Sequence, residues 1–565
     1  MPMSHRVLAV LAALSLTACP EHAPAWYGLT DEASATTGDL DGGGNSPPTS
    51  ATQGPDVADS TDSDPTPTTG DWTTGAVSAT TTTGDSTGAP VNDPPTVALA
   101  LSPEIIEAAG VVKLSIEVSP DVIELDVVYR GEIVATLPPA DFPYHFEVTS
   151  PAKCDGSEGL SVLARDAEGL VGDDAKPLAC SLPASGSEAQ KAKLPGETLS
   201  MVNSVAIHGD GFVAAGVMDG QIVVWRVGPD LQLLPGWPRM LADWTAVPGL
   251  AALDSAAVGV TVDAEQNIIV AGNTMKAGVK SYYVVKLNAA GSRLGDEAQG
   301  MPEEEAAGVA VTAEGVIVVA GAVRTAAQPP AYDWRVWGHA KLGQAPWVDT
   351  LPLGAGEDPD EFNDRSEHAR AVVVMPGGEL LVVGERDYRK LGKSDTFVRA
   401  SCQRFDSKGV RVGDLWTSDA NGTENAHDAA NAVVVLPGDG FVISGWARAK
   451  LGQSPQVWSR RFQQGEAQDF RVEPASAAEA KAIGHDREGN LVVATTLTSA
   501  GQLDAWAFAF RGWALPAVWS QPPYGDPQGW DGYTSIVCTD WGYCLAGGFL
   551  TVGNELTGFL RLHNP

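Results

Sequence analysis

The chain has 565 residues, with 71 Asp and Glu against 36 Lys and Arg and a formal net charge of −35. Proteins that bind nucleic acid need a basic face for the phosphate backbone, so this balance excludes nucleic acid as an expected partner. Part of the charge lies near the amino terminus, because no Lys or Arg occurs between Arg6 and Lys113.

The amino terminus predicts an export signal over residues 1–18. Its apolar stretch, Val7 to Leu16, is too short to span a bilayer as a mature helix. The stretch ends in Leu16-Thr-Ala-Cys19, which resembles the bacterial lipobox, whose cysteine is diacylated and becomes the mature amino terminus. The resemblance implies lipidation of Cys19 and stable anchoring, since more than one acyl chain would be attached. The alternative is an ordinary signal peptide with Cys19 an incidental thiol.

Residues 19–93 predict a disordered tether. Thr, Ser, Gly, Pro and Asp dominate the segment, and such a composition cannot bury enough apolar surface to offset the entropy lost on ordering. We therefore expect a flexible acidic spacer between the lipid bilayer and the folded part of the chain. The expected location is the outer membrane or the cell surface.

Residues 94–183 predict a small immunoglobulin-like β-sandwich, because seven short alternating strands with turn signals follow one another. The stretches Val127–Val134, Phe142–Tyr144 and Ala164–Gly169 resemble bacterial Ig-like surface modules. The family's usual Asp-Gly hairpin is Arg130-Gly131 here, and the resemblance implies a fold but no ligand. The expected strands are Thr96–Leu101, Val111–Val118, Ile123–Tyr129, Glu132–Leu137, Tyr144–Val148, Leu160–Ala164 and Pro177–Leu182.

Residues 186–565 contain one pattern seven times: an apolar run, a turn with Gly or Asp, and a second apolar run ending in a small residue. Units of about 49 to 63 residues in a seven-fold array predict a closed seven-bladed β-propeller. A third strand and a weaker fourth strand follow in most units, so the chain as a whole is expected to be all-β. The small residues are Gly216, Gly272, Gly321, Gly384, Gly445, Thr495 and Gly547.

The seventh unit predicts how the ring closes. It ends at Leu562–Pro565, directly after its third strand, and an exposed strand edge favours aggregation. The spare sequence lies just before the first repeat, at Gln190–Leu199. We therefore expect this segment to pair with the final blade as its outer strand.

The repeat resembles the seven-bladed propeller repeats called SBBP and the related delta-60 repeat over residues 197–565. Unit six ends in Ala494-Thr495 and unit one is shortened, which departs from the pattern. The resemblance implies the fold and no shared activity. The residues that carry it are Asp263, Asn267, Gly272, Lys286, Leu287, Gly315, Gly321, Arg404, Phe405, Glu488, Gly489 and Asn490.

Six cysteines fit an exported protein. Cys154 and Cys180 lie symmetrically about Ala167, and Cys538 and Cys544 about Trp541, which predicts two disulfides in an oxidising compartment. Four reduced core thiols are the alternative. Cys402 alternates with apolar residues on one strand face and is expected in the core. No C-x-x-C or paired-His spacing suggests zinc, and no cofactor is expected.

Charged loops predict a possible polar binding face. The loop that enters a unit's first strand and the loop after its second strand open on the same side of a propeller; the first set is acidic here and the second basic. They form either a rim of weak surface salt bridges or a recognition face for protein or glycan. The residues proposed for that face are Glu303, Glu304, Glu305, Glu357, Asp358, Arg386, Lys390, Arg448 and Lys450.

Two further patterns have structural interpretations. His368 and His427 start strands in adjacent units with acidic residues nearby, but no third ligand is spaced to complete a metal site. Tryptophans on or beside the strands favour blade packing over a sugar platform.

The sequence therefore predicts a non-catalytic binding or display platform. The alternatives are an extracytoplasmic propeller enzyme (a polysaccharide lyase or a quinoprotein-like oxidoreductase) and a structural spacer in a surface assembly.

Replacing the proposed lipidation site tests the anchor. Cys19→Ser removes the only thiol in the lipobox-like segment, so the variant should be released from membranes and remain unprocessed by the lipoprotein signal peptidase. Membrane fractionation and mass spectrometry of the mature amino terminus measure this. A wild-type amino terminus without acyl mass would contradict the prediction.

Overall fold

The computed structural model describes residues 93–564 with gaps. The predicted signal peptide, Cys19 and the tether lie outside the described residues. Within the described part of the chain, no helix is long and apolar enough to cross a membrane. The gaps are 103–104, 107–110, 130, 139–143, 150–158, 178, 181–185, 197–198, 245–253, 299–302, 328–329, 352–361, 391–395, 419–426, 437, 439, 449–453, 464–465, 473–477, 487–488, 500–501, 512–518, 521–529, 540–541 and 554.

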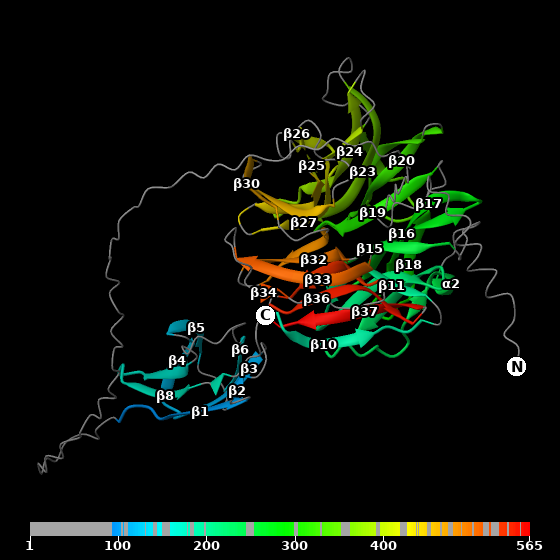
Figure 1. Ribbon diagram of the computed structural model, residues 1–565. Helices are drawn as coiled ribbons and strands as arrows, with labels where there is room; N and C mark the ends of the chain where they lie inside the picture. Colours follow the sequence, from blue (N-terminus) through cyan, green and yellow to red (C-terminus); the bar gives the residue numbers. More distant parts are fainter. Residues whose placement is uncertain are drawn as a thin grey trace, which may run out of the picture. The chain divides into compact units, whose positions relative to one another are not determined.

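The first folded part is the expected sandwich of two antiparallel sheets (Figure 1). Strand β7 alternates buried and partly exposed residues along its length, which places one face in the core. Leu114, Ile116, Val127 and Val162 pack between the sheets. One sheet has the order β1 (Val97–Ser102), β3 (Val111–Val118), β6 (Tyr144–Thr149); the other has β5 (Glu132–Leu137), β4 (Val122–Tyr129), β7 (Gly159–Asp166), β8 (Val171–Pro177).

The sequence analysis missed one sandwich strand. Strand β8 pairs with β7 directly across a turn in which Asp166 Oδ1 accepts the Leu170 amide at 2.8 Å. It is a polar edge strand without an apolar alternation, so no pattern predicted it. The range expected as a strand, Pro177–Leu182, contains β9 (Ala179–Cys180), which pairs with β2 (Ile105–Ile106). Cys154 lies outside the described residues, so the Cys154–Cys180 disulfide stays a prediction.

Seven four-stranded antiparallel units follow, as predicted. Each first strand lies against the first strand of the next unit, and the seventh lies against the first, so the described first strands form a closed inner ring. Units one to four are β11 (Ser200–His208), β12 (Gly211–Met218), β13 (Gln221–Val227), β14 (Arg239–Met240); β15 (Ala256–Val262), β16 (Ile268–Lys276), β17 (Val279–Leu287), β18 (Arg293–Ala298); β19 (Glu304–Val311), β20 (Ile317–Ala327), β21 (Pro330–His339), β22 (Trp347–Leu351); and β23 (Phe362–Val374), β24 (Leu380–Lys390), β25 (Thr396–Phe405), β26 (Arg411–Thr417).

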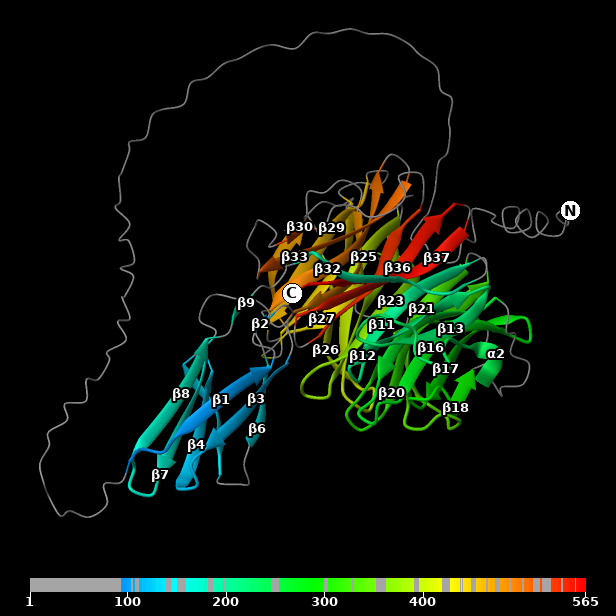
Figure 2. The same ribbon diagram turned by 90° about the horizontal axis from the view of Figure 1, so that it is seen from below.

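The remaining units have the same plan, and the short helix α2 (Leu241–Trp244) contacts β13 at the periphery (Figure 2). Second strands such as β16 are buried along most of their length, since adjacent units cover both faces of each sheet. Units five to seven are β27 (His427–Val435), β28 (Phe441–Arg448), β29 (Gln456–Gln463), β30 (Glu466–Val472); β31 (Ala478–His485), β32 (Asn490–Ser499), β33 (Gln502–Arg511), β34 (Trp519–Ser520); and β35 (Gly532–Cys538), β36 (Cys544–Val552), β37 (Glu555–His563) with β10 (Glu188–Lys193).

A β-bulge in every first strand explains the recurring small residue. At Gly216 an added Cβ would lie 1.8 Å from the carbonyl oxygen of Met201, and at Gly445 it would lie 1.8 Å from that of Ala429. The close approach of two backbones therefore favours glycine at this position, which only Thr495 of unit six replaces among the seven units. In unit seven the equivalent residue is Gly548, opposite Tyr533, and not Gly547 as the sequence suggested.

The bulge inserts one extra residue per unit, and three of these residues link adjacent units. Asn203 Nδ2 donates to the Ala257 carbonyl at 2.8 Å, and Asn431 Nδ2 donates to the Ala480 carbonyl at 2.9 Å. Thr534 Oγ1 donates to the carbonyl of Val202 and so links the last unit to the first. The seven extra residues are Asn203, Val258, Ala307, Arg370, Asn431, Lys481 and Thr534.

The ring closes as predicted. Strand β10 pairs antiparallel with β37, beside which it lies in Figure 1. The closure begins two residues before the expected Gln190 and continues after the strand, since the Leu194 amide donates to the Gly558 carbonyl at 2.8 Å. Leu560 and Leu562 of β37 pack with Ala189 and Ala192 of the closing strand.

Removal of the closing strand should destabilise the propeller. The five paired residues of β10 and their packing contribute on the order of 5 kcal/mol at about 1 kcal/mol per main-chain hydrogen bond. Deletion of residues 188–193 is expected to lower the thermal midpoint and cause aggregation, as measured by calorimetry and light scattering. Deletion of residues 20–92 is the control and should leave both unchanged. Equal midpoints for the two deletions would disprove the role of β10.

Buried His563 makes the same junction sensitive to acid. Its Nδ1 lies 3.2 Å from the Gly186 carbonyl oxygen, and the side chain is fully buried. Burial, aided by Arg561, lowers the pKa of His563 from 6.5 to about 4. Above pH 6.5 the residue is neutral in both states and contributes nothing. Between pH 6.5 and about 4 the unfolded chain takes up a proton that the folded chain rejects, so stability falls as the pH falls.

The His563 contribution can be isolated by substitution. The lowered pKa corresponds to a loss on the order of 3 kcal/mol between pH 7 and 4. His563→Gln, which does not titrate, should therefore lose less stability than the wild type over this range in urea unfolding. An identical pH dependence of the two proteins would show that His563 is not responsible.

Candidate functional site

The described residues of the proposed binding face gather at one end of the propeller. Because the first two strands of each unit are antiparallel, every first strand begins and every second strand ends at the same end, which we call the entry pole. Glu304 begins β19 and Arg386 lies near the end of β24. The opposite end carries the turns between first and second strands, and we call it the turn pole.

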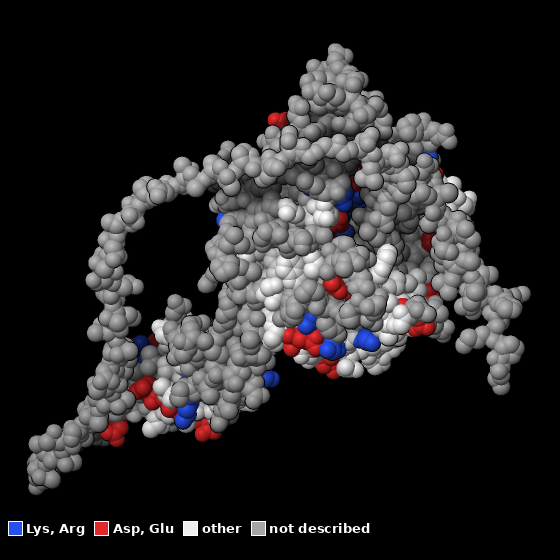
Figure 3. Space-filling view, in the orientation of Figure 1, with Lys and Arg blue, Asp and Glu red and all other residues white. Residues whose placement is uncertain are grey.

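The structure divides the predicted face into separate ion pairs. Glu303 pairs with Arg324, Glu304 with Arg335 at 2.9 Å, and Glu305 with Lys280 at 2.7 Å. Arg386 bonds Glu367 at 2.6 Å and Arg448 lies over the Trp446 ring at 5.0 Å. Charges of both signs are interspersed on the described surface in Figure 3. Glu357, Asp358 and Lys450 lie outside the described residues, and the Lys390 side chain is not described.

Six charged residues from four units also meet at the entry pole, and the face proposed from the sequence included only Glu305 among them. They are three cations and three carboxylates, joined as Lys280–Glu305 at 2.7 Å, Arg370–Glu385, and Lys481–Glu479 at 2.6 Å. The pairs interact electrostatically: Lys481 lowers the pKa of Glu385, and Glu305 raises the pKa of Arg370. We call these six residues the inner cluster. Arg370 and Lys481 are the extra bulge residues of their units.

His368 and Tyr332 adjoin the inner cluster. The His368 Nδ1 lies 3.8 Å from Glu385, and its ring centre lies 5.0 Å from that of Tyr332 in the preceding unit. Burial and neighbouring Arg370 lower the pKa of His368 to about 4, so the imidazole is neutral at pH 7. The sequence analysis considered His368 as a metal ligand and disfavoured that role. Among the described residues, no group of three or more His, Cys, Asp or Glu could hold a metal ion.

The Arg370–Glu385 pair is held fully charged. Burial alone would raise the pKa of Glu385, but the charge of Arg370 and its hydrogen bond to Glu385 outweigh burial and hold that pKa below its usual value. Burial opposes the charge on Arg370 as well, and Glu385 overcomes it and raises the Arg370 pKa. Both side chains are enclosed by protein and yet remain 26% and 13% exposed, respectively. The pair is therefore fixed in place and still reachable by solvent.

The third and fourth units are joined more closely than the others at this pole. Strand β23 has 13 residues, against seven to nine in the other first strands. Its extension brings Ser366 into parallel pairing with Tyr332 of β21, so the two units share one sheet. Tyr332 and His368 thus lie on backbones that are fixed to each other.

Behind the inner cluster lies a buried ion pair. Glu367 and Arg386 face each other across β23 and β24 and are 0% and 1% exposed. They occupy the opposite face of these strands from His368 and Glu385, because successive residues of a strand alternate in direction. A buried pair adds little net stability, but loss of one partner is costly because the other charge remains desolvated.

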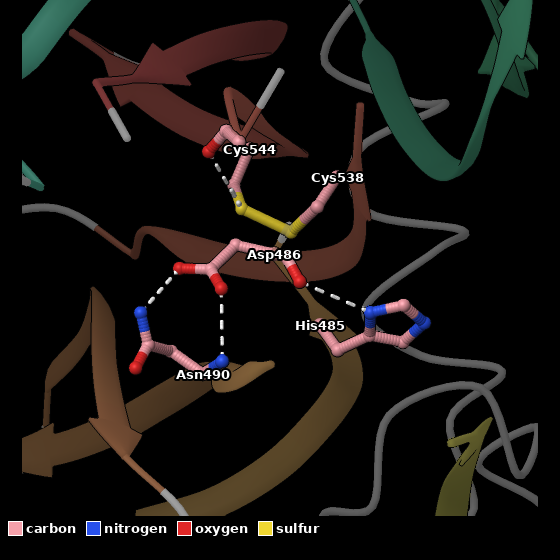
Figure 4. The surroundings of a disulfide bond; sticks show 6 residues. His485, Asp486, Asn490, Cys538 and Cys544 are labelled. Carbon is pink, nitrogen blue, oxygen red and sulfur yellow. Dashed lines mark hydrogen bonds between the residues drawn. A yellow bond between two sulfur atoms is a disulfide. The ribbon is translucent and has the colours of Figure 1, made fainter. Parts of the chain in front are cut away.

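The turn pole contains structural motifs. Cys538 and Cys544 form the predicted disulfide between directly opposed residues of β35 and β36 (Figure 4). Beside it, Asp486 accepts the Asn490 amide at 2.8 Å and its Nδ2 at 2.7 Å, which closes the preceding hairpin. Asp263 and Asn267 repeat this arrangement in the second unit. The Asp and Asn of the repeat therefore serve turn formation.

Cys402 and several of the tryptophans on the strands belong to the core, as predicted. Cys402 is a buried free thiol whose pKa is raised by burial to about 12. Trp225, Trp337 and Trp458 are almost fully buried, and Trp458 Nε1 donates to the Trp446 carbonyl at 2.7 Å.

Comparisons with known proteins add little. No family model and no curated protein matches the chain. A protein of unknown function from Dyadobacter fermentans is 12% identical, with a TM-score of 0.37 over 67% of this chain and 99% of that one. Polysaccharide lyase Uly1 is 10% identical, with a TM-score of 0.40 over 66% of this chain and 91% of that one. Sqt1 from Chaetomium thermophilum is 10% identical, with a TM-score of 0.36 over 68% of this chain and 100% of that one. The propeller assignment rests on the strand pairing described above.

Removal of one partner from the buried pair should be far more costly than the same change at the surface. Arg386→Met leaves Glu367 buried without its counter-charge and should destabilise the propeller by about 3–5 kcal/mol. The control, Arg324→Met, breaks the partly exposed pair with Glu303 and should cost about 1 kcal/mol or less. Chemical unfolding of both variants measures the difference. Equal losses would contradict the assignment of the Glu367–Arg386 pair as the buried one.

Proposed function

We propose that this is an exported, lipid-anchored protein whose propeller binds a protein or glycan at the entry pole without catalysis. The anchor is supported by the lipobox-like segment that ends in Cys19. The binding site is supported by the inner cluster, to which the second, third, fourth and sixth units contribute.

One observation carries the proposal: the charges at the bulge positions exceed what the fold needs. In three other units the equivalent residue is uncharged and donates one hydrogen bond to a backbone carbonyl of the next unit; these residues are Asn203, Asn431 and Thr534. Arg370 and Lys481 instead place charges in a partly enclosed site, where desolvation is unfavourable. Charged groups kept at such a site, and still exposed, favour recognition over support of the fold.

The ionisation states favour binding over catalysis. Glu385 is held ionised by Arg370, so it is a poor proton donor at neutral pH. His368 is neutral, but a pKa of about 4 makes it a weak base. The alternatives remain an extracytoplasmic propeller enzyme and a structural spacer, and each gives a different result in the experiment below.

A capture experiment tests the proposed function. The full chain is immobilised and exposed to arrayed glycans and to surface proteins of the producing cell. Arg370→Asn with Lys481→Asn gives both bulges the residue that two other units already carry, and because Glu385 and Glu479 each lose a cation, circular dichroism and the thermal midpoint first establish that the variant is folded. We expect the wild type to retain a ligand, the double variant to lose it, and the turn-pole control Lys286→Asn to keep it.

The other outcomes overturn the proposal in distinct ways. Equal capture by the double variant would place the site elsewhere. Degradation or oxidation of an applied substrate would favour the enzyme, and absence of both capture and turnover would favour the spacer.

A further inference from the structure

We infer that the inner cluster binds a neutral glycan, with one sugar ring against Tyr332 and its hydroxyls on the charged groups. The inference rests on the proposed function and specifies its ligand. The observations that carry it are the charge balance of the cluster, its unused hydrogen-bonding groups, and the aromatic ring beside it.

The charge balance disfavours ionic ligands. Lys280, Arg370 and Lys481 are each bonded to one carboxylate within the cluster, so three positive and three negative charges sum to zero. An anion would lie beside three carboxylates as well as three cations, and a cation beside three cations as well as three carboxylates, so neither gains a net Coulomb attraction. The net charge of −35 repels polyanionic glycans as well. A neutral ligand needs no such attraction.

Hydrogen-bonding capacity remains after the ion pairs are made. Arg370 bonds Glu385 through Nη2, and a guanidinium group carries five N–H donors. Lys280 Nζ uses one of its three donors on Glu305. A sugar hydroxyl both donates and accepts, so it can bond to a cation and to its paired carboxylate together. Hydrogen bonds to charged groups are the stronger kind.

Tyr332 supplies the apolar surface that a sugar ring requires. The residue is partly exposed, its ring lies beside the neutral His368, and its backbone is fixed by the parallel pairing of Tyr332 with Ser366. Tyrosine presents a flat apolar face and loses little side-chain freedom on binding. An ionic ligand would gain little from this neutral pair of rings, whereas the C–H face of a pyranose can lie on it.

Calorimetric titration of the full chain tests the inference. The probes are neutral hexasaccharides of glucose, mannose and N-acetylglucosamine, with polygalacturonate and heparin as the acidic set. We expect a neutral hexasaccharide to bind with a Kd that changes less than about twofold between about 50 and about 500 mM NaCl, since no net charge is neutralised. Tyr332→Leu should weaken binding about tenfold or more.

Two further variants keep the result interpretable. Arg370→Asn should also weaken binding; Asn is native at this bulge in other units, and the thermal midpoint of the variant measures the cost of leaving Glu385 without Arg370. Trp530→Leu is the matched control, since Trp530 is 50% exposed outside the cluster, and it should bind as the wild type does. Unchanged binding by both Tyr332→Leu and Arg370→Asn would overturn the inference.

The experiment separates failure of the inference from failure of the proposed function. Salt-sensitive binding of an acidic glycan, or binding of a protein only, would overturn the neutral-glycan assignment and leave the binding platform standing. Absence of any ligand here and in the capture experiment would overturn both.

Discussion

The pairing of β10 with β37 is the interaction on which the other features of the propeller depend. Each unit buries apolar residues on both faces of its sheet, so no unit is complete without two neighbours. A chain that runs once around the ring would leave its last sheet with an uncovered edge. Bringing the amino-terminal strand to that edge joins the two ends of the domain and holds the seven first strands in a ring.

The β-bulge of each first strand connects the fold to the proposed function. The bulge forces two backbones together opposite Gly216 and its equivalents, which limits that position to small residues and produces the repeat visible in the sequence. The inserted residue has no such restriction, since Asn, Val, Ala, Arg, Lys and Thr all occupy it. One position thus fixes the architecture, and its neighbour can vary to suit a ligand.

The sequence predicted the number of units, their hairpins, the closing strand and the Cys538–Cys544 disulfide, because each depends on local spacing or on a count of strands. It did not predict the inner cluster, since Lys280, Glu305 and Arg370 belong to three units and meet only when the ring forms. The bulge also shifts the register by one residue, so the direction of Arg370 could not be read from alternation. Strand β8 was missed for a different reason: it lies at the edge of its sheet, where few side chains are buried, so its sequence has no apolar alternation.

The closing ladder is reinforced at the end where the chain enters the propeller. Asn564 donates its amide to the Ser187 carbonyl at 2.9 Å and accepts the Gly186 amide at 2.8 Å, while its Nδ2 reaches the Ser187 hydroxyl at 2.9 Å. Arg561 pairs with Glu188 at 3.0 Å beside them. If the amino terminus is anchored as proposed, any pull on the tether reaches β10 at this end first. Side-chain bonds there oppose fraying at the point where tension would begin to separate β10 from β37.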